Sequence, residues 1–138
     1  MDEIVLVKEC LSDSKLNTGK DLLEKLDASG ISIEAAYWVY SYDTNDWRLH
    51  IITPEIDRRG WEKGFASLQK ITRTFPVSFR LDVLVRGLKH RFYRHMLDLR
   101  RDRSYLDVEL DRLPVGGDLV DLYIYRLPAP HKKGSNHA

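Results

Sequence analysis

Cysteine is nearly absent from this chain of 138 residues, and so are long apolar runs. The single cysteine, Cys10, excludes an internal disulfide and is typical of a protein from a reducing compartment. No stretch approaches the roughly 18 consecutive apolar residues that a membrane-spanning helix needs. Acidic residues follow Met1, where a signal peptide requires positive charge. We therefore expect a cytoplasmic protein without a membrane partner.

The sequence also lacks the short motifs of common catalytic and nucleotide-binding sites. No glycine-rich phosphate-binding pattern follows an expected strand, and neither Gly-x-Ser-x-Gly nor Cys-x-x-Cys occurs. His90 and His95 are five residues apart, so they cannot form the pair, four residues apart on one helix face, that grips zinc. These absences favour a non-catalytic protein that needs no cofactor.

What is present is the composition of one ordinary globular domain. The chain is 43% hydrophobic and 31% charged, and its length suffices for a core without disulfides or metals. The Pro-Ala-Pro segment at 128–130 ends the last apolar stretch. We therefore predict a single domain over residues 1–130 and a disordered polar tail over residues 131–138.

Hydrophobic periodicity predicts both helices and strands. Apolar residues recur every three or four positions in three segments, which we expect to be helical: 2–28, as one bent helix or two, 58–75 and 88–101. Alternating or β-branched residues predict strands over 33–42, 47–53, 79–85, 106–111 and 119–127. Turn residues at 43–46 and 114–118 join four of these strands into two hairpins.

This order of elements predicts an α+β fold. Two hairpins and a single strand favour an antiparallel or mixed sheet of about five strands, with three to four helices packed on one face. Trp61, Phe65, Leu68 and Ile71 form the stripe that we expect the second helix to turn toward the core. Cys10 lies in an apolar run and is expected to be a buried structural thiol.

Parts of the expected sheet resemble a known family. The segment Ala-Ala-Tyr-Trp-Val-Tyr at 35–40, with Trp-Arg-Leu at 47–49 and Ile-Thr-Pro at 52–54, is similar to the hairpin of a small bacterial α+β family. The segment Leu-Tyr-Ile-Tyr-Arg-Leu at 122–127 is similar to the last strand of that family. The family has no established activity, so the resemblance implies the fold and nothing about function.

Charge is sorted along the chain, although the net charge is only +1. Residues 58–103 contain 13 Lys and Arg against 4 Asp and Glu, a local net charge of +9. Residues 1–57 contain 5 against 12, a net charge of −7, and residues 104–138 have a net charge of −1. Because local field rather than total charge attracts a partner, we expect a docking surface in the middle of the chain.

The third expected helix carries the basic face that could form this surface. On a regular helix, His90, Arg91, Arg94 and Arg101 would lie opposite the apolar stripe. Guanidinium groups bind carboxylates and phosphates through planar forks, and Tyr93 beside them could stack on a nucleic-acid base. A solvated helix face that binds nothing explains the same pattern.

Two weaker candidate sites accompany this face. Arg58 and Arg59 stand at the expected start of the second helix, where a phosphate could bind. Asp107, Glu109 and Asp111 alternate on an expected strand, so they could hold a divalent cation or perform acid–base chemistry. A solvated outer face of the sheet, or contact with the basic helix of the same or a second copy, explains these carboxylates equally well.

These patterns together favour a cytosolic interaction module without catalytic activity. We expect it to dock an acidic or polyanionic partner, or a second copy of itself, through the basic helix face. One alternative is an accessory protein that binds nucleic acid with the same arginines, and another is a metal-dependent hydrolase that uses the strand carboxylates. An exposed edge of the aromatic-rich hairpin would favour a homodimer.

Overall fold

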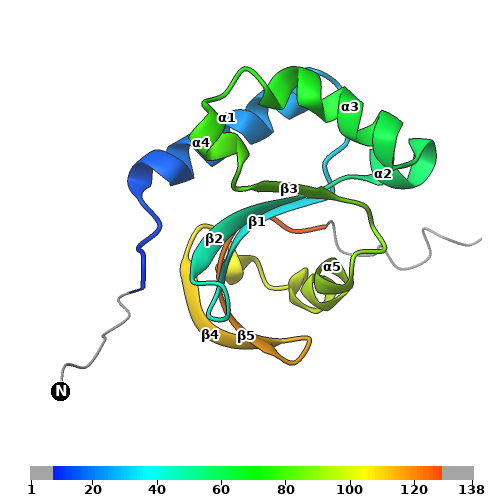
Figure 1. Cartoon of the computed structure of the whole chain (residues 1–138). Coiled ribbons are helices and arrows are strands. Elements are labelled where there is room, and N and C mark those ends of the chain that lie inside the picture. Colours follow the sequence, from blue (N-terminus) through cyan, green and yellow to red (C-terminus); the bar gives the residue numbers. More distant parts are fainter. Residues whose placement is uncertain (1–7, 129–138) are drawn as a thin grey trace, which may run out of the picture.

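Five strands form one mixed sheet in the computed structural model, which describes residues 8–128 (Figure 1). The strands are β1 (Ala35–Ser41), β2 (Asp46–Ile52), β3 (Val83–Arg86), β4 (Glu109–Val115) and β5 (Asp118–Arg126), in the order β3-β2-β1-β5-β4. All neighbours are antiparallel except β2 and β3, which are parallel. The predicted α+β class is confirmed. The tail predicted at 131–138 lies outside the described residues.

Short helices surround this sheet. They are α1 (Asp13–Ala28), α2 (Pro54–Arg59), α3 (Trp61–Thr72), α4 (Val77–Arg80) and α5 (Arg91–Met96), with 3-10 turns η1 (Leu97–Leu99) and η2 (Arg103–Tyr105). Ser12 caps α1 by accepting a hydrogen bond from the Lys15 N–H, so among the described residues the helix predicted over 2–28 begins at residue 13. Residues 2–7 of that prediction lie outside the described residues. No helix of the described chain has the length and apolar character needed to cross a membrane.

Strand β1 is buried on both faces, because its side chains alternate between two hydrophobic cores. The first core lies between the sheet and α1, α3 and α4, and the second lies between the sheet and α5. Trp38 and Tyr40 face α1, α3 and α4, whereas Tyr37 and Val39 face α5. Figure 1 shows these helices on opposite sides of the sheet. The prediction had placed all helices on one face. The uninterrupted apolar run at 35–40 requires cover on both faces, and α5 supplies the second layer.

The predicted helix over 58–75 is two helices. Thr53 accepts a hydrogen bond from the Glu55 N–H and Pro54 occupies the first turn, so α2 begins before the predicted helix. Gly60 has φ of +82°, which ends α2 and allows α3 to start in a new direction. Of the predicted core stripe, Leu68 is fully buried, but Trp61 is 49% exposed.

The segment predicted as a strand over 79–85 begins as a helical turn instead. Pro76 precedes α4, and Phe79 is buried against Trp38 of the first core. Leu81, which alternation placed with the core residues, is 69% exposed. Strand β3 therefore starts only at Val83, where pairing with β2 becomes available.

The third predicted helix and the first strand of the last hairpin are also displaced. Helix α5 starts at Arg91 rather than at 88, because Leu88 donates its N–H to the Asp57 carboxylate at 2.7 Å and the chain turns there. Strand β4 starts at Glu109, because Asp107 has φ of +60° and lies outside regular strand geometry.

Residues 8–12 cross the sheet without regular structure. Trp47 Nε1 donates to the Glu9 carbonyl at 2.7 Å, and the Lys8 ammonium lies 5.0 Å from the Trp47 ring. This course leaves Cys10 exposed, so the prediction of a buried thiol is wrong. Contacts with Trp47, an aromatic residue distant in sequence, help to position this segment.

The aromatic-rich hairpin does not provide a free sheet edge. Strands β1 and β2 are interior, and the edges are β3 and β4. On β3, Val85 is only 2% exposed and its carbonyl accepts a hydrogen bond from Arg86 Nη1 at 2.8 Å. Strand β4 carries charges, a bulge and Pro114. Both edges therefore have features that oppose pairing with another chain.

Candidate docking surface

Basic side chains gather on the segment that covers the second face of the sheet. Helix α5 is held there by Tyr93 and Met96, which are 4% and 0% exposed and pack in the second core. The rest of the segment projects cations into solvent. We define the α5 basic surface by its exposed lysine and arginine residues: Lys89, Arg91, Arg94, Arg101 and Arg103.

Few carboxylates of the described chain compensate these charges. Arg91 lies 3.6 Å from Asp118, and both side chains are more than half exposed, so the pair contributes at most about 1 kcal/mol and exchanges readily. Asp102 accepts hydrogen bonds from the Ser104 hydroxyl and N–H, which lower the pKa of its carboxyl group. The remaining arginines are free to bind carboxylates or phosphates from another molecule.

A shallow hollow of about 220 Å³ lies within this surface and is lined by Leu97, Asp98, Arg100 and Arg101. Arg100 is half-buried, and its Nε has no hydrogen-bond partner among the described residues. That nitrogen is buried, so the exposed Arg101 is the cation that the hollow offers to solvent. The Arg-Arg-Asp-Arg run at 100–103 carried this signal in the sequence, but periodicity assigned it to a helix end.

Two of the five predicted surface residues turn inward. His90 is half-buried, 5.7 Å from the ring of His50, and burial together with Arg86 and Arg91 lowers its pKa. Burial of Tyr93 raises its pKa to about 12 and leaves no ring face for a base. Arg91, Arg94 and Arg101 are exposed as predicted. His90 lies before α5 rather than within it, and α5 packs Tyr93 and Met96, three residues apart, against the sheet.

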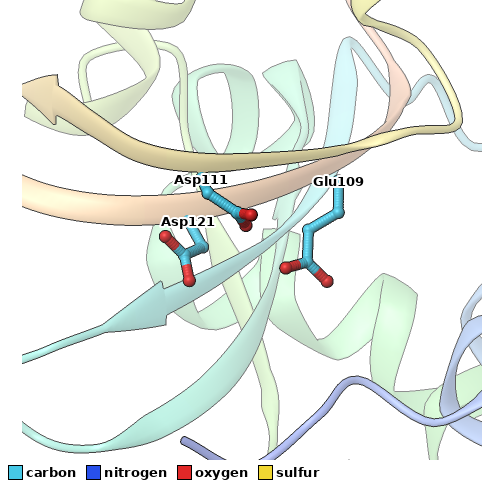
Figure 2. A group of neighbouring side chains, drawn as sticks. All are labelled: Glu109, Asp111 and Asp121. Carbon is cyan, nitrogen blue, oxygen red and sulfur yellow. The ribbon is translucent and has the colours of Figure 1, made fainter.

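The predicted carboxylates form a different group from the one expected. Oxygen atoms of Glu109, Asp111 and Asp121 lie within 4.8 Å of one another, and Figure 2 shows the three groups together. Asp107 is not among them. Asp121 joins because β5 pairs with β4, and a bulge between Leu110 and Leu113 shifts the register.

Lys8 provides the positive charge for this acidic cluster. Its Nζ lies 2.5 Å from Asp121, 2.8 Å from Glu109 and 3.8 Å from Asp111. Burial alone would lower the pKa of Lys8, but hydrogen bonds to Asp121 and Glu109 raise it above its ordinary value. The three carboxylates are the described residues with the geometry to hold a metal ion, and the Lys8 ammonium already lies among them.

Asp121 is the buried member of the acidic cluster. Its side chain is 0% exposed and accepts hydrogen bonds from the Arg112 N–H at 2.7 Å and from the Tyr42 hydroxyl at 2.8 and 2.9 Å. Burial raises the pKa of Asp121, but these donors and Lys8 outweigh burial and lower it. The cluster is an ion-pair site that ties residue 8 to β4 and β5.

Arg58 and Arg59 are the last residues of α2, and Gly60, the N-cap residue of α3, follows them directly. Phosphate binding at this helix start stays a prediction. Arg58 Nη1 lies 3.6 Å from the Glu55 carboxylate. Arg59 Nη1 donates to the Ser67 hydroxyl at 2.5 Å, across the α2–α3 junction. The two arginines therefore point to different partners.

The fold and its surfaces define a mixed-sheet α+β domain with one strongly basic face. Comparison with family models, with curated proteins and with solved structures finds no match to this chain. The resemblance of the hairpin and the last strand to a small bacterial family stays a prediction. The function of this chain is therefore inferred from its own exposed side chains.

Proposed function

We propose that this chain is a cytosolic interaction module without catalytic activity, which docks an acidic partner through the α5 basic surface. The observation that carries the proposal is the excess of exposed cations. Five exposed lysine and arginine side chains project from residues 89–103, against the exposed Asp98 and Asp102 of the same segment and one exposed ion pair of Arg91 with Asp118. Such a surface attracts carboxylates and phosphates and accelerates encounter with an anionic partner.

An acidic protein segment is the partner that these side chains fit best. The cations lie on a short helix and its following turns, where each guanidinium can pair with a separate carboxylate. Tyr93 is buried, so the surface loses the stacking platform that single-stranded nucleic acid uses. Binding of nucleic acid would then depend on phosphates alone and would not discriminate among sequences.

Self-association is an extension of the same proposal. Helix α1 on the opposite side of the sheet carries exposed Asp13, Asp21 and Glu24, which could meet the basic surface of a second copy. Such a contact joins two different faces, so it generates rings or chains unless it closes as a pair. A closed homodimer would need each copy to present both faces to the other.

The hydrolase alternative has less support from the geometry. Hydrolysis assisted by a metal needs a carboxylate cluster that is free to ligate a cation. The Lys8 ammonium lies 2.5 to 3.8 Å from all three carboxylates of the acidic cluster. An ion pair that anchors residue 8 accounts for these carboxylates without catalysis.

Fluorescence polarisation tests the proposal directly. The full chain is titrated into a labelled polyglutamate peptide, a labelled duplex DNA and a labelled single-stranded RNA at about 50 mM salt, where phosphate contacts are strong. We expect binding to polyglutamate that weakens as salt is raised. Absence of binding to all three probes contradicts the proposal, and tighter binding to either nucleic acid assigns the surface to the nucleic-acid alternative.

Sedimentation of the chain alone measures self-association. We expect a monomer at micromolar concentration and high salt, with weak self-association as the salt is lowered, because both sheet edges are protected and salt screens contacts between exposed charges. A stable dimer that survives high salt would contradict the electrostatic contact and require another interface.

A further inference from the structure

A pocket of about 480 Å³ opens between the end of α1 and the α2–α3 pair. These helices cover the face of the sheet opposite to α5 (Figure 1). The pocket is therefore separate from the α5 basic surface. Its volume lies within the range of about 300–1,000 Å³ that is usual for small-molecule sites. Its lining combines cations, hydroxyl groups, one carboxylate and two isoleucines.

Two cations of the pocket lack a carboxylate partner within 4.0 Å among the described residues. Arg59 is oriented by its hydrogen bond to the Ser67 hydroxyl, which uses one of its five N–H donors. Lys70 lies three residues after Ser67 on α3, so the two side chains share one side of that helix. The Ser67 hydroxyl itself donates to the Lys63 carbonyl at 3.1 Å. The guanidinium and the ammonium can thus contact one multivalent anion.

One carboxylate and two isoleucines in the pocket lining restrict the chemistry of the rest of the ligand. Glu55 also lines the pocket, where its side chain is 18% exposed. Its carboxylate repels a second anionic group and accepts hydrogen bonds from hydroxyl or amino groups. Ile31 and Ile71 provide apolar contact for a small carbon skeleton. The lining therefore favours one anionic group on a body that carries donors.

We propose that this pocket binds a small molecule with a single phosphate group. The phosphate lies between Arg59 and Lys70, and hydroxyl or amino groups of the ligand face Glu55. A phosphate suits this pair better than a carboxylate, because its three terminal oxygens can accept hydrogen bonds from the remaining N–H groups of Arg59 and from the Lys70 ammonium together. The inference is independent of the proposed docking function, since the two surfaces share no residue.

Amide chemical shifts test the proposal with glycerol 3-phosphate as the probe. The ¹⁵N-labelled chain is titrated with glycerol 3-phosphate, with inorganic phosphate, with glycerol and with succinate at matched ionic strength. We expect both phosphates to shift amides of residues 29–31 and 67–71, with glycerol 3-phosphate binding more tightly. Glycerol should shift none of them, and succinate should bind more weakly.

Matched variants on α3 locate the binding. Lys70→Gln and Arg59→Gln should each weaken glycerol 3-phosphate binding by about tenfold or more, as expected for loss of a hydrogen bond to a charged group. Lys63→Gln on the same helix lies outside the pocket lining and should not change the affinity. The dispersion of each variant spectrum reports whether the variant is folded, and a destabilised Arg59→Gln leaves Lys70→Gln as the test.

Three results would overturn the inference. Shifts confined to residues 89–103 would place anion binding on the α5 basic surface and leave the pocket empty. Equal affinity for succinate would remove the preference for phosphate. Unchanged affinity in both pocket variants would show that the phosphate contacts other side chains. None of these results bears on whether an acidic protein docks at α5.

Discussion

His50 is a buried titratable side chain beside Tyr37 of the second core. It is 8% exposed, and its ring lies 5.2 Å from Tyr37 and 5.7 Å from His90. Burial lowers the pKa of His50 to about 3, and the charges of His90, Arg86 and Arg48 act in the same direction. Its Nδ1 has no hydrogen-bond partner among the described residues. The folded protein therefore holds this imidazole neutral.

Acid should destabilise the fold through His50 before the carboxylates titrate. The unfolded chain binds a proton at the ordinary pKa of 6.5, whereas the folded chain binds it only near 3. The stabilising contribution is therefore complete above pH 6.5 and falls as the pH is lowered from 6.5 toward 3. Urea unfolding of His50→Phe should show a smaller loss of stability than the native sequence between about pH 7 and about pH 4.5. An identical loss in both proteins would contradict this assignment.

The Lys8–Asp121 pair should be required for stability. Lys8→Met leaves the buried Asp121 carboxylate without its cation and beside Glu109, and we expect a loss of about 3 kcal/mol in unfolding free energy. Adding Asp121→Asn to that variant should recover part of the loss. Lys15→Met is the matched control, because Lys15 pairs with Asp82 and Glu9 at the surface. Equal losses in Lys8→Met and Lys15→Met would contradict a buried ion pair.

At the scale of elements, the junction of α2 and α3 depends on one glycine. A Cβ atom at Gly64 would lie 2.8 Å from the Glu55 carbonyl oxygen and 2.9 Å from the Ile56 Cα. These are backbone atoms, so no side-chain rotation relieves the contact. The absence of a side chain at Gly64 therefore allows the two helices to approach, and the same approach positions Arg59 beside Ser67.

Gly64→Ala should lower stability by about 1–3 kcal/mol through overpacking. The sign of this change in stability is informative, because alanine is a better helix former than glycine by about 1 kcal/mol and would stabilise an unconstrained helix. Gln69→Ala, at an exposed position of the same helix, should leave stability nearly unchanged. Thermal unfolding of the three proteins measures both effects. A higher melting temperature for Gly64→Ala would show that α2 and α3 do not depend on this contact.

The elements that the sequence predicts well are those with local signals. The β1–β2 hairpin was located within about two residues at each end, because turn residues at 43–46 lie between two aromatic runs. The region from 76 to 101 was located poorly. Alternation at Phe79, Leu81 and Val83 is equally consistent with a strand and with a helical turn, and pairing with β2 decides between them.

The candidate sites were likewise predicted well only where the signal is local in sequence. Arg91, Arg94 and Arg101 could be predicted as exposed, because charged side chains rarely occupy a core. The inward orientation of Tyr93 could not be predicted, since it depends on how α5 packs against the sheet. The participation of Asp121 in the acidic cluster could not be predicted either. It requires the register of β4 on β5 and the course of residues 8–12 across the sheet.

At the scale of the whole molecule, the sheet separates the α5 basic surface from a side of mixed charge (Figure 1). On that side, the exposed carboxylates of α1 lie among exposed lysines and arginines of α1, α2 and α3. A chain with a net charge of only +1 can therefore carry a local excess of cations at α5. The affinity of the chain for an anionic partner should therefore depend more on the position of a substituted charge than on the change in net charge.

Two variants with equal net charge test this central claim most directly. Arg91→Glu, Arg94→Glu and Arg101→Glu reverse three charges on the α5 basic surface, whereas Lys20→Glu, Lys63→Glu and Arg73→Glu reverse three exposed charges on and just after α1 and α3. Their affinities for labelled polyglutamate are compared at about 50 mM salt. We predict that the first variant loses binding and the second retains it. Equal weakening in both variants would show that net charge alone governs binding and would contradict a docking surface at α5.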